Sequence, residues 1–576
     1  MSTLPIALTG SHESAERPTA PPAPQRRNVI AALLVVLATM AGTVWPSLNN
    51  DVTYAFGGIA NAGKGGVSVW DVFVARPIAY RLLIHGLDSG RSLLVGDPSL
   101  TITQLVIRAE TGLLVAAVAT VLFLGLRHFL EPQVAAIAAV TTGLALIAAP
   151  PWHFLQPDWV AALAAVLAVG AACAPRPVWA GALLGGLAVT LVIAVKLATL
   201  PIAILAVLLV GVLNRRRAAW TAVATAGFTV LWYAATKHFL PWEWTWLNDQ
   251  ANLVDDSPIH HGLRWADFHH LLIGTGDVAV LSPIMLAAPP AAVALIRRLP
   301  TGRSRVVGAA VAVVAAGLSL AAAYGQGEFY MYHYASVPVL AAGTVGAAFA
   351  LCPAARLPLA ATAALGAVAA FLLLHRPAAW RLTHATAVDS AFAVAAIAVA
   401  VVVWVTANRR PWSPPIVLGT AALGATLAVA SLPGSPYAFS TYDYQYHINH
   451  QSTAAFTALR ARIGANTPVL YLTFGSVNNL MGNPTSCRYP SPQWLQRGAG
   501  ILRVRAYPSY ADNLRCLTDD HQARYLILQP GWFNVNRSSP QVRNLIAAQF
   551  DCSPAARIPA PKTLEVCPAR QLSTSH

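Results

Sequence analysis

The sequence is poor in charged side chains. Asp, Glu, Lys and Arg make up only 11% of its 576 residues, whereas 56% are hydrophobic and the mean hydropathy is +0.54. Soluble domains usually carry about a quarter charged residues, so this composition excludes an ordinary soluble domain. The chain also lacks an obvious P-loop, which argues against a nucleotide-driven pump. What remains is a protein that crosses a membrane many times.

The net charge of +15 is spread along the chain in short clusters at the ends of apolar runs. Arg215–Arg217, Arg297–Arg298 and Arg409–Arg410 are examples. Such clusters are typical of the positive-inside rule, and they form no single basic surface. We therefore expect a lipid bilayer as a partner and no nucleic acid.

The apolar runs predict about 13 transmembrane helices. They lie near 29–47, 104–127, 133–150, 158–174, 178–194, 198–213, 218–238, 278–296, 306–324, 334–351, 357–375, 387–406 and 415–432. Arginines follow the even-numbered runs, which places the N-terminus in the cytoplasm and the C-terminus outside. The expected plan is a disordered cytoplasmic segment 1–27, a transmembrane domain 28–432 in a multi-pass cell-membrane protein, and an extracytoplasmic domain 433–576.

The tail 433–576 is predicted to be an α/β domain with disulfides. Apolar runs at 469–475 and 524–528 indicate strands, and 451–464, 509–520 and 539–549 indicate helices. Four of the six cysteines lie here, and three pairings are possible. Short local loops favour Cys487–Cys516 and Cys552–Cys567, and the alternative is free buried thiols in a cytoplasmic tail.

Two outer segments carry charges that a simple anchor does not need. In the long loop 48–103, Asp51 follows the first span directly, and a surface helix starting near Pro77 would carry Arg81. Asp158 begins the fourth span, and Lys196 closes the fifth. Asp51 and Asp158 could simply cap helices, and Lys196 could snorkel to the interface. Together they indicate one polar site, because a charge at a membrane boundary is costly and usually functional.

This arrangement resembles the GT-C superfamily of integral membrane glycosyltransferases, which use polyprenyl-phosphate sugars. The similar features are the acid after the first span, the long outer loop with a surface helix, the acid before span four, the Gly185-Gly186 span ending in Lys196, and the segment 328–338. The plan of about 13 spans before an extracytoplasmic domain resembles bacterial arabinosyl-, mannosyl- and oligosaccharyltransferases.

The resemblance implies an inverting-type displacement that transfers a sugar from a polyprenyl-phosphate donor to an envelope glycan, glycolipid or protein. Asp51 and Asp158 would be the catalytic aspartates, and Lys196, Arg81 and His333 would hold the donor phosphate. A divalent metal, Mg or Mn, is left open, with Asp51 as its candidate ligand, because Asn50-Asp51 is not an acid pair. Candidates for contact with the acceptor are Arg76, Tyr80, Trp159, Tyr332 and Trp244.

The outer loop 239–277 is rich in aromatic residues, including Trp244, and reads either as an acceptor platform or as an interfacial aromatic belt. Two other classes of protein also remain. A membrane transporter or flippase would show charges inside its spans, such as Arg108 and Glu110. A non-catalytic scaffold for envelope assembly would use the tail as an interaction domain.

Overall fold

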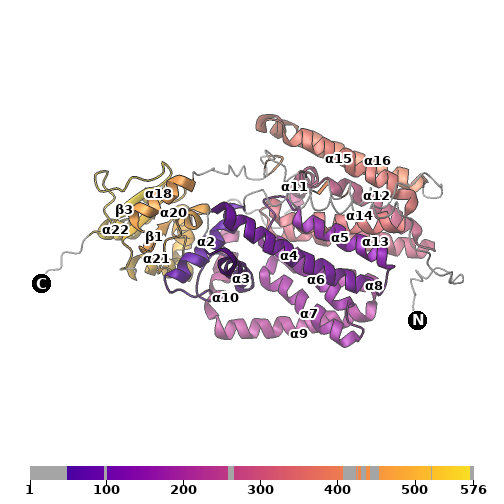
Figure 1. The fold of residues 1–576 in the computed structure, drawn as a ribbon, viewed down its shortest axis with the longest axis horizontal. Helices are drawn as coiled ribbons and strands as arrows, with labels where there is room; N and C mark the ends of the chain where they lie inside the picture. Colours follow the sequence, from indigo (N-terminus) through magenta and orange to yellow (C-terminus); the bar gives the residue numbers. More distant parts are fainter. Residues whose placement is uncertain are drawn as a thin grey trace.

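The computed structural model describes residues 48–96, 100–256, 265–406, 453–519 and 522–570, with the isolated positions 423, 426, 427, 429, 436 and 438–440. A long helical bundle occupies one end of the molecule, and a small α/β domain occupies the other (Figure 1). Helices α2 (Asn50–Lys64), α3 (Ile78–Val95) and α10 (Pro241–Asp256) lie between them. The predicted span 29–47 and most of 415–432 fall outside the described residues.

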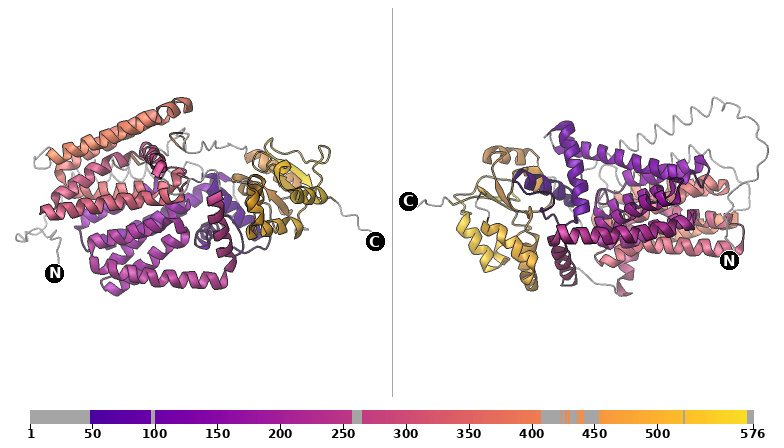
Figure 2. Two further views of the ribbon diagram at one scale, coloured as in Figure 1. Left: turned by 180° about the vertical axis from the view of Figure 1, so that it is seen from behind. Right: turned by 90° about the horizontal axis from the view of Figure 1, so that it is seen from below.

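The bundle is built from apolar helices that coincide with the predicted runs. They are α4 (Leu100–Leu126), α5 (Pro132–Ile147), α6 (Pro157–Cys173), α7 (Val178–Val195), α8 (Leu200–Leu213), α9 (Arg215–Phe239), α13 (Gly302–Gln326), α14 (Ser336–Leu351), α15 (Arg356–Leu374) and α16 (Ala378–Thr406). Among the described residues, 7 helices are long and apolar enough to cross a membrane, or up to 8 with one bent pair. The chain is thus a polytopic helical membrane protein, and further views show its helices running roughly side by side (Figure 2).

Small residues let the helices of the bundle approach closely. A Cβ at Gly170 of α6 would lie 2.6 Å from the backbone nitrogen of Leu122 in α4. A Cβ at Gly185 of α7 would lie 2.6 Å from the Cβ of Ala172. Lipid gives no hydrophobic drive for helices to associate, so this close backbone packing holds the bundle together.

The predicted span 278–296 is not one continuous helix. The segment is broken into α11 (Phe268–Leu281), the 3-10 turn η3 (Pro283–Ala287) and α12 (Ala288–Arg298), and the two halves meet at 106°. Pro283 follows the break at Ser282 and has no N–H to continue the helix.

The first outer loop holds two helices, of which the sequence predicted one. Helix α3 (Ile78–Val95) begins beside Pro77, as expected. Helix α2 (Asn50–Lys64) was missed, because its three glycines lower its helix propensity. Asn49 caps α2 by accepting a hydrogen bond from the amide of Asp51 (2.8 Å). Asp51 therefore sits in the first turn of a helix.

The C-terminal domain contains a mixed three-stranded sheet in the order β1-β2-β3. Strands β1 (Val469–Leu472) and β2 (Tyr525–Leu528) are parallel, and β3 (Glu565–Pro568), which was not predicted, pairs with β2 in the antiparallel sense. The helices are α18 (Thr453–Ile463), α19 (Ser476–Met481), α20 (Gln493–Gly500), α21 (Pro508–Asp519) and α22 (Pro540–Gln549).

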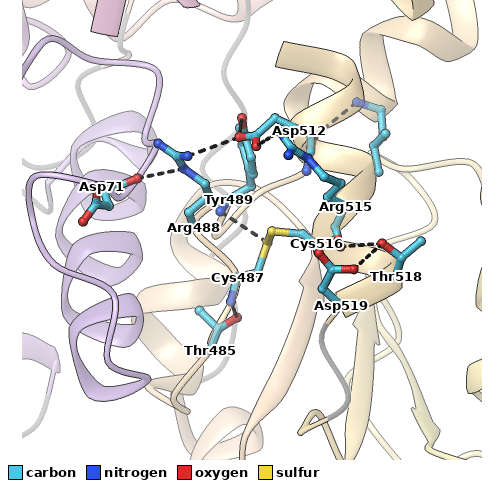
Figure 3. The surroundings of a disulfide bond; sticks show 12 residues. Asp71, Thr485, Cys487, Arg488, Tyr489, Asp512, Arg515, Cys516, Thr518 and Asp519 are labelled. Carbon is cyan, nitrogen blue, oxygen red and sulfur yellow. Dashed lines mark hydrogen bonds and ion pairs between the residues drawn. A yellow bond between two sulfur atoms is a disulfide. The ribbon is translucent and has the colours of Figure 1, made fainter. Parts of the chain in front are cut away.

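Two disulfides brace this domain in the pairing favoured from the sequence, Cys487–Cys516 and Cys552–Cys567. Beside the first, Tyr489 donates a hydrogen bond to Asp512 (2.5 Å), and Arg515 also pairs with Asp512 (Figure 3). Two parallel strands and one antiparallel strand make too small a sheet to bury a large core alone, so these covalent links add stability.

The C-terminal domain docks directly on α2. The side-chain amide of Asn61 donates to the backbone carbonyl of Asn478 (2.7 Å), and the backbone carbonyl of Asn61 accepts from the amide of Thr485 (3.1 Å). Lys64 donates to the carbonyl of Gly482 (3.1 Å). Gly57 faces the backbone of Asn479 so closely that a Cβ would collide with it. Helix α2 thus contacts both the C-terminal domain and the helical bundle.

Candidate active site

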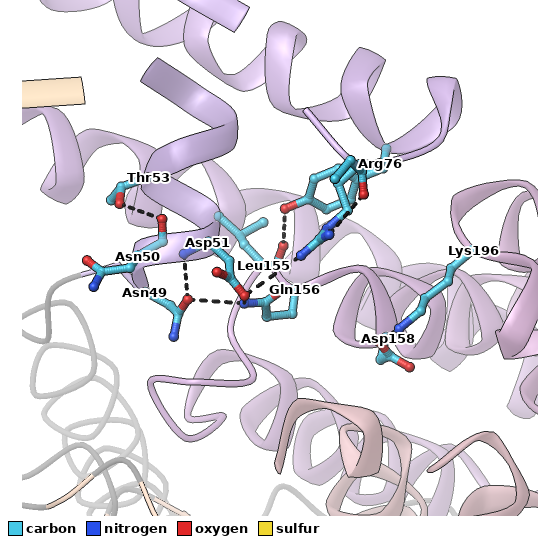
Figure 4. Close-up of polar contacts among 11 residues, drawn as sticks. Asn49, Asn50, Asp51, Thr53, Arg76, Leu155, Gln156, Asp158 and Lys196 are labelled. Atoms are coloured by element: carbon cyan, nitrogen blue, oxygen red, sulfur yellow. Dashed lines mark hydrogen bonds and ion pairs between the residues drawn. The ribbon is translucent and has the colours of Figure 1, made fainter. Parts of the chain in front are cut away.

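Asp51 lies where α2 meets the bundle, within a small polar network (Figure 4). Gln156, which precedes α6, donates to Asp51 Oδ2 (3.4 Å) and to Asn49 Oδ1 (3.2 Å). The Arg76 guanidinium lies 3.8 Å from Asp51 Oδ2. The side chains of Asp51 and Arg76 keep 18% and 24% of their surface open to water. Asp51 is therefore a carboxylate held in place yet reachable by a ligand.

Asp158 and Lys196 form the second half of the site. Lys196 Nζ donates to Asp158 Oδ2 (2.9 Å), and Gln326 Nε2 donates to Asp158 Oδ1 (3.0 Å). Asp158 has no exposed surface, whereas 24% of the Lys196 side chain is exposed. Both oxygens of Asp158 therefore accept a hydrogen bond, and the ion pair holds the ammonium of Lys196 in place.

The two halves influence each other electrostatically. Burial raises the pKa of Asp51 above its ordinary value, and Arg76, Gln156 and Lys196 each lower it in part. Burial lowers the pKa of Lys196, while Asp158 opposes this shift. Arg76 also lowers the pKa of Lys196. Two cations and two carboxylates from four chain segments thus share one region at the edge of the bundle.

Aromatic rings from the segment before α14 flank Lys196. Its ammonium lies 5.3 Å from the ring centre of Tyr332, which is within cation–π range. Tyr332 stacks on Tyr330 (5.8 Å) and packs against Trp152 (6.2 Å), while His333 is buried beside it. The structure therefore brings Tyr332 to Lys196.

Arg81 has partners different from those expected of a phosphate ligand. Its guanidinium is 2% exposed and forms an ion pair with Glu243 of α10 (Pro241–Asp256) at 3.0 Å. The remaining donors reach the carbonyls of Val69 (3.2 Å), Trp70 (3.2 Å) and Arg76 (3.0 Å). Four of the five N–H donors of this guanidinium are thus engaged inside the protein, and its 2% exposure keeps it away from a ligand. Arg81 instead fixes the backbone of the loop that presents Arg76.

Three further candidates occupy structural positions. Tyr80 donates to the carbonyl of Leu155 (2.8 Å), and Trp159 donates to that of Leu146 (3.0 Å), and both rings are buried. Trp244 packs against Trp232 and Tyr233 of α9 and donates to Thr236 (3.1 Å). The structure thus places Trp244 against α9.

Sequence reasoning missed the amides of the site. Asn49, Gln156 and Gln326 each hold a carboxylate or the group beside it. The sequence feature that could have identified them is their position, since each is a polar residue at the end of an apolar run. Amides are common at such ends, so only the fold shows that these three converge.

The residues around Asp51 do not fit a divalent cation. Mg²⁺ and Mn²⁺ prefer several oxygen ligands, whereas here a guanidinium already lies beside the carboxylate. Among the residues that the structure describes, no group of three or more His, Cys, Asp or Glu side chains could hold a metal.

No family model and no curated protein matches the chain. Two solved structures are similar to it over 95% of its length and 98% of theirs. They are ArnT from Cupriavidus metallidurans in the apo state (16% identity, TM-score 0.48) and the same protein bound to undecaprenyl phosphate (17% identity, TM-score 0.48). A likeness at this level does not assign a function.

Proposed function

We propose that this protein is a glycosyltransferase that moves a sugar from a polyprenyl-phosphate donor to an extracytoplasmic acceptor. The observation that carries the proposal is the convergence of Asp51, Arg76 and Lys196 at the edge of the bundle, each partly open to water. Two fixed cations suit a phosphate, and a nearby carboxylate of raised pKa suits a base.

Arg76 and Lys196 bind the donor phosphate in this proposal. Lys196 directly follows α7, which is long and apolar enough to span a membrane, and this supports a place for its ammonium near the lipid headgroups. A phosphate there would compete for an ammonium already aimed by Asp158 (2.9 Å). As the bond from the anomeric carbon to the phosphate oxygen breaks, the electron pair stays on that oxygen. Fixed cations stabilise the growing charge, which is usually a large part of catalysis.

Asp51 serves as the general base. The carboxylate takes the proton of an acceptor hydroxyl as the oxygen attacks the anomeric carbon, so the displacement inverts that centre. Gln156 and Asn49 hold Asp51 in place, and Arg76 keeps a cation beside it. Asp158 acts as a positioning residue for Lys196, which departs from the catalytic role expected from the sequence. The arginine clusters support an N-terminus inside and a site facing outward.

A transfer assay with the full chain in lipid nanodiscs tests this function. Radiolabelled polyprenyl-phosphate sugars and membrane-extracted acceptors would be supplied, and product would be counted. We expect Asp51→Asn to lower the rate by roughly 10²–10⁴, the usual worth of a general base, with binding of polyprenyl phosphate retained. Asp71→Asn is the control, because Asp71 lies in the same loop but is exposed and bonded to Ser68. Full activity in Asp51→Asn would refute the role of base.

A transporter of a lipid-linked substrate is the second candidate, and one observation favours it. The broken helix α11 carries the buried Asp277, which accepts from Ser440 (2.7 Å). Asp389 of α16 lies against Gly276, and among the described residues neither of its carboxylate oxygens accepts a hydrogen bond. Broken helices and carboxylates inside spans are typical of transporters. Movement of a labelled lipid across liposomes without a new glycosidic bond would establish this function instead.

A further inference from the structure

The loops that follow the two parallel strands meet at one edge of the C-terminal sheet. Strand β1 ends at Leu472 and β2 ends at Leu528, in register with each other. After β1, the amide of Phe474 donates to the side chain of Gln529, which follows β2 (3.1 Å). In open α/β sheets this carboxyl edge is where ligands usually bind.

Two aromatic rings lie flat against each other at this edge. Phe474 and Trp532 stack with centres 5.4 Å apart and planes at 15°. Both are only partly buried, whereas the neighbouring Phe533 is 1% exposed and anchors the turn. The amides of Trp532 and Phe533 both donate to the carbonyl of Gln529 (2.9 and 2.8 Å). The turn therefore holds the Trp532 ring at a fixed angle. We call Phe474, Gln529 and Trp532 the aromatic edge.

The aromatic edge faces the first turn of α2. The ring of Phe474 lies 5.0 Å from that of Tyr54, one helical turn beyond Asp51. Gly475 has a left-handed φ of 70°, and a Cβ added to it would lie 3.5 Å from the side chain of Asn50. The edge thus reaches the residue next to the proposed base.

We propose that the aromatic edge binds a sugar ring of the acceptor and directs its hydroxyl toward Asp51. This inference rests on the proposed function. A sugar presents a flat face of C–H groups to an aromatic ring and hydroxyls around its rim. The edge offers that combination, since flat rings lie beside the amides of Gln529 and Asn50. The acceptor is therefore a carbohydrate, whether free or attached to lipid or protein, and not an unglycosylated peptide or lipid.

Saturation-transfer NMR on the full chain in nanodiscs tests binding directly. The probes would be octyl glycosides of glucose, galactose, mannose and arabinose. We expect saturation at the sugar-ring protons of at least one probe, and loss of that signal in Trp532→Ala. Trp265→Ala is the matched control, because Trp265 is 84% exposed and stacks on Phe268 (5.4 Å) away from the edge. Equal signals in wild type and Trp532→Ala would overturn the proposal, as would saturation of the octyl chain alone.

The transfer reaction gives the second readout. Trp532→Ala should raise the KM for the acceptor by roughly tenfold, the loss expected of one aromatic contact, with the KM for the donor unchanged. Trp532→Tyr should restore most of it. Phe474→Leu serves as the second variant if Trp532→Ala does not fold. Transfer with an unchanged acceptor KM in all of these variants refutes the aromatic edge alone, whereas no transfer by wild type refutes the proposed function.

Discussion

Removing the charge of Glu243 should loosen the loop that presents Arg76. The Arg81–Glu243 pair is buried, with side chains 2% and 3% exposed and 3.0 Å between the charged atoms. Glu243 also accepts from the amide of Ile78 (2.7 Å), so it fixes the start of α3. The variant Glu243→Gln keeps the shape and one acceptor, but it leaves the guanidinium of Arg81 without a counter-charge.

The size of the effect follows from the geometry. At 3.0 Å and an effective dielectric constant of about 20, the Coulomb attraction is about 5.5 kcal/mol before the cost of desolvation. Losing one partner of a buried pair usually costs about 3–5 kcal/mol, so we expect about 3 kcal/mol here. Replacing both residues by apolar ones should not recover this loss. The carbonyls of Val69, Trp70 and Arg76 would then lack their donor, at about 1–3 kcal/mol each.

Amide hydrogen exchange over residues 66–84 measures this effect. A loss of about 3 kcal/mol should speed exchange by about 100-fold and raise the KM for the donor, because Arg76 loses its fixed position. Asp88→Asn in α3 is the control, since its pair with Arg91 is partly exposed (20% and 10%) and should matter little. Unchanged exchange in Glu243→Gln, or exchange equal to that of the control, would refute this reasoning.

Three further predictions concern the base and the C-terminal domain. Because burial raises the pKa of Asp51, the rate should fall with decreasing pH at a value above an ordinary aspartate's. Lys196→Met removes a charge that lowers this pKa, so a pH–rate profile should show the acid limb moving up, and a downward move would contradict the assignment. Replacing both cysteines of the Cys487–Cys516 pair by serine should destabilise the domain by about 3.6 kcal/mol, from a separation of 29 residues. Denaturant unfolding checks this, and a loss under 1 kcal/mol would refute it. Gly57→Ala should clash with the backbone of Asn479 and speed exchange in Ser476–Met481, whereas Gly63→Ala, with open space around it, should not.

The sequence predicted the bundle because hydropathy depends only on local composition. The runs at 104–127 and 306–324 each became one helix, α4 and α13. It failed where local and global preferences differ. The run 278–296 is apolar throughout, yet Pro283 breaks it. Helix α2 contains glycines that weaken the local signal, and its contacts with the C-terminal domain stabilise it.

The candidate site was predictable in part. Asp51, Asp158 and Lys196 stood out because a charge at the end of a span is costly, and the structure brings Lys196 to Asp158. The roles of Arg81 and Arg76 could not be separated from sequence. They lie five residues apart, and only the position of Glu243, 162 residues beyond Arg81, shows which of them is engaged. The role of a charged side chain that depends on a partner far away in the sequence cannot be predicted from the residues around it.

Helix α2 connects the C-terminal domain to Asp51, so a movement of the domain is transmitted to this carboxylate. Its 15 residues span about 22 Å, with Asp51 at one end and the Asn61 and Lys64 contacts at the other. A tilt of only about 3° at the far end would move the carboxylate by about 1 Å, a misplacement that can cost about 10²-fold in rate. In the proposed reaction, the orientation of the C-terminal domain would therefore affect the rate of transfer, because it helps to position Asp51 relative to Arg76 and Lys196. Changes that rotate this domain relative to the bundle would therefore lower the rate of the proposed reaction.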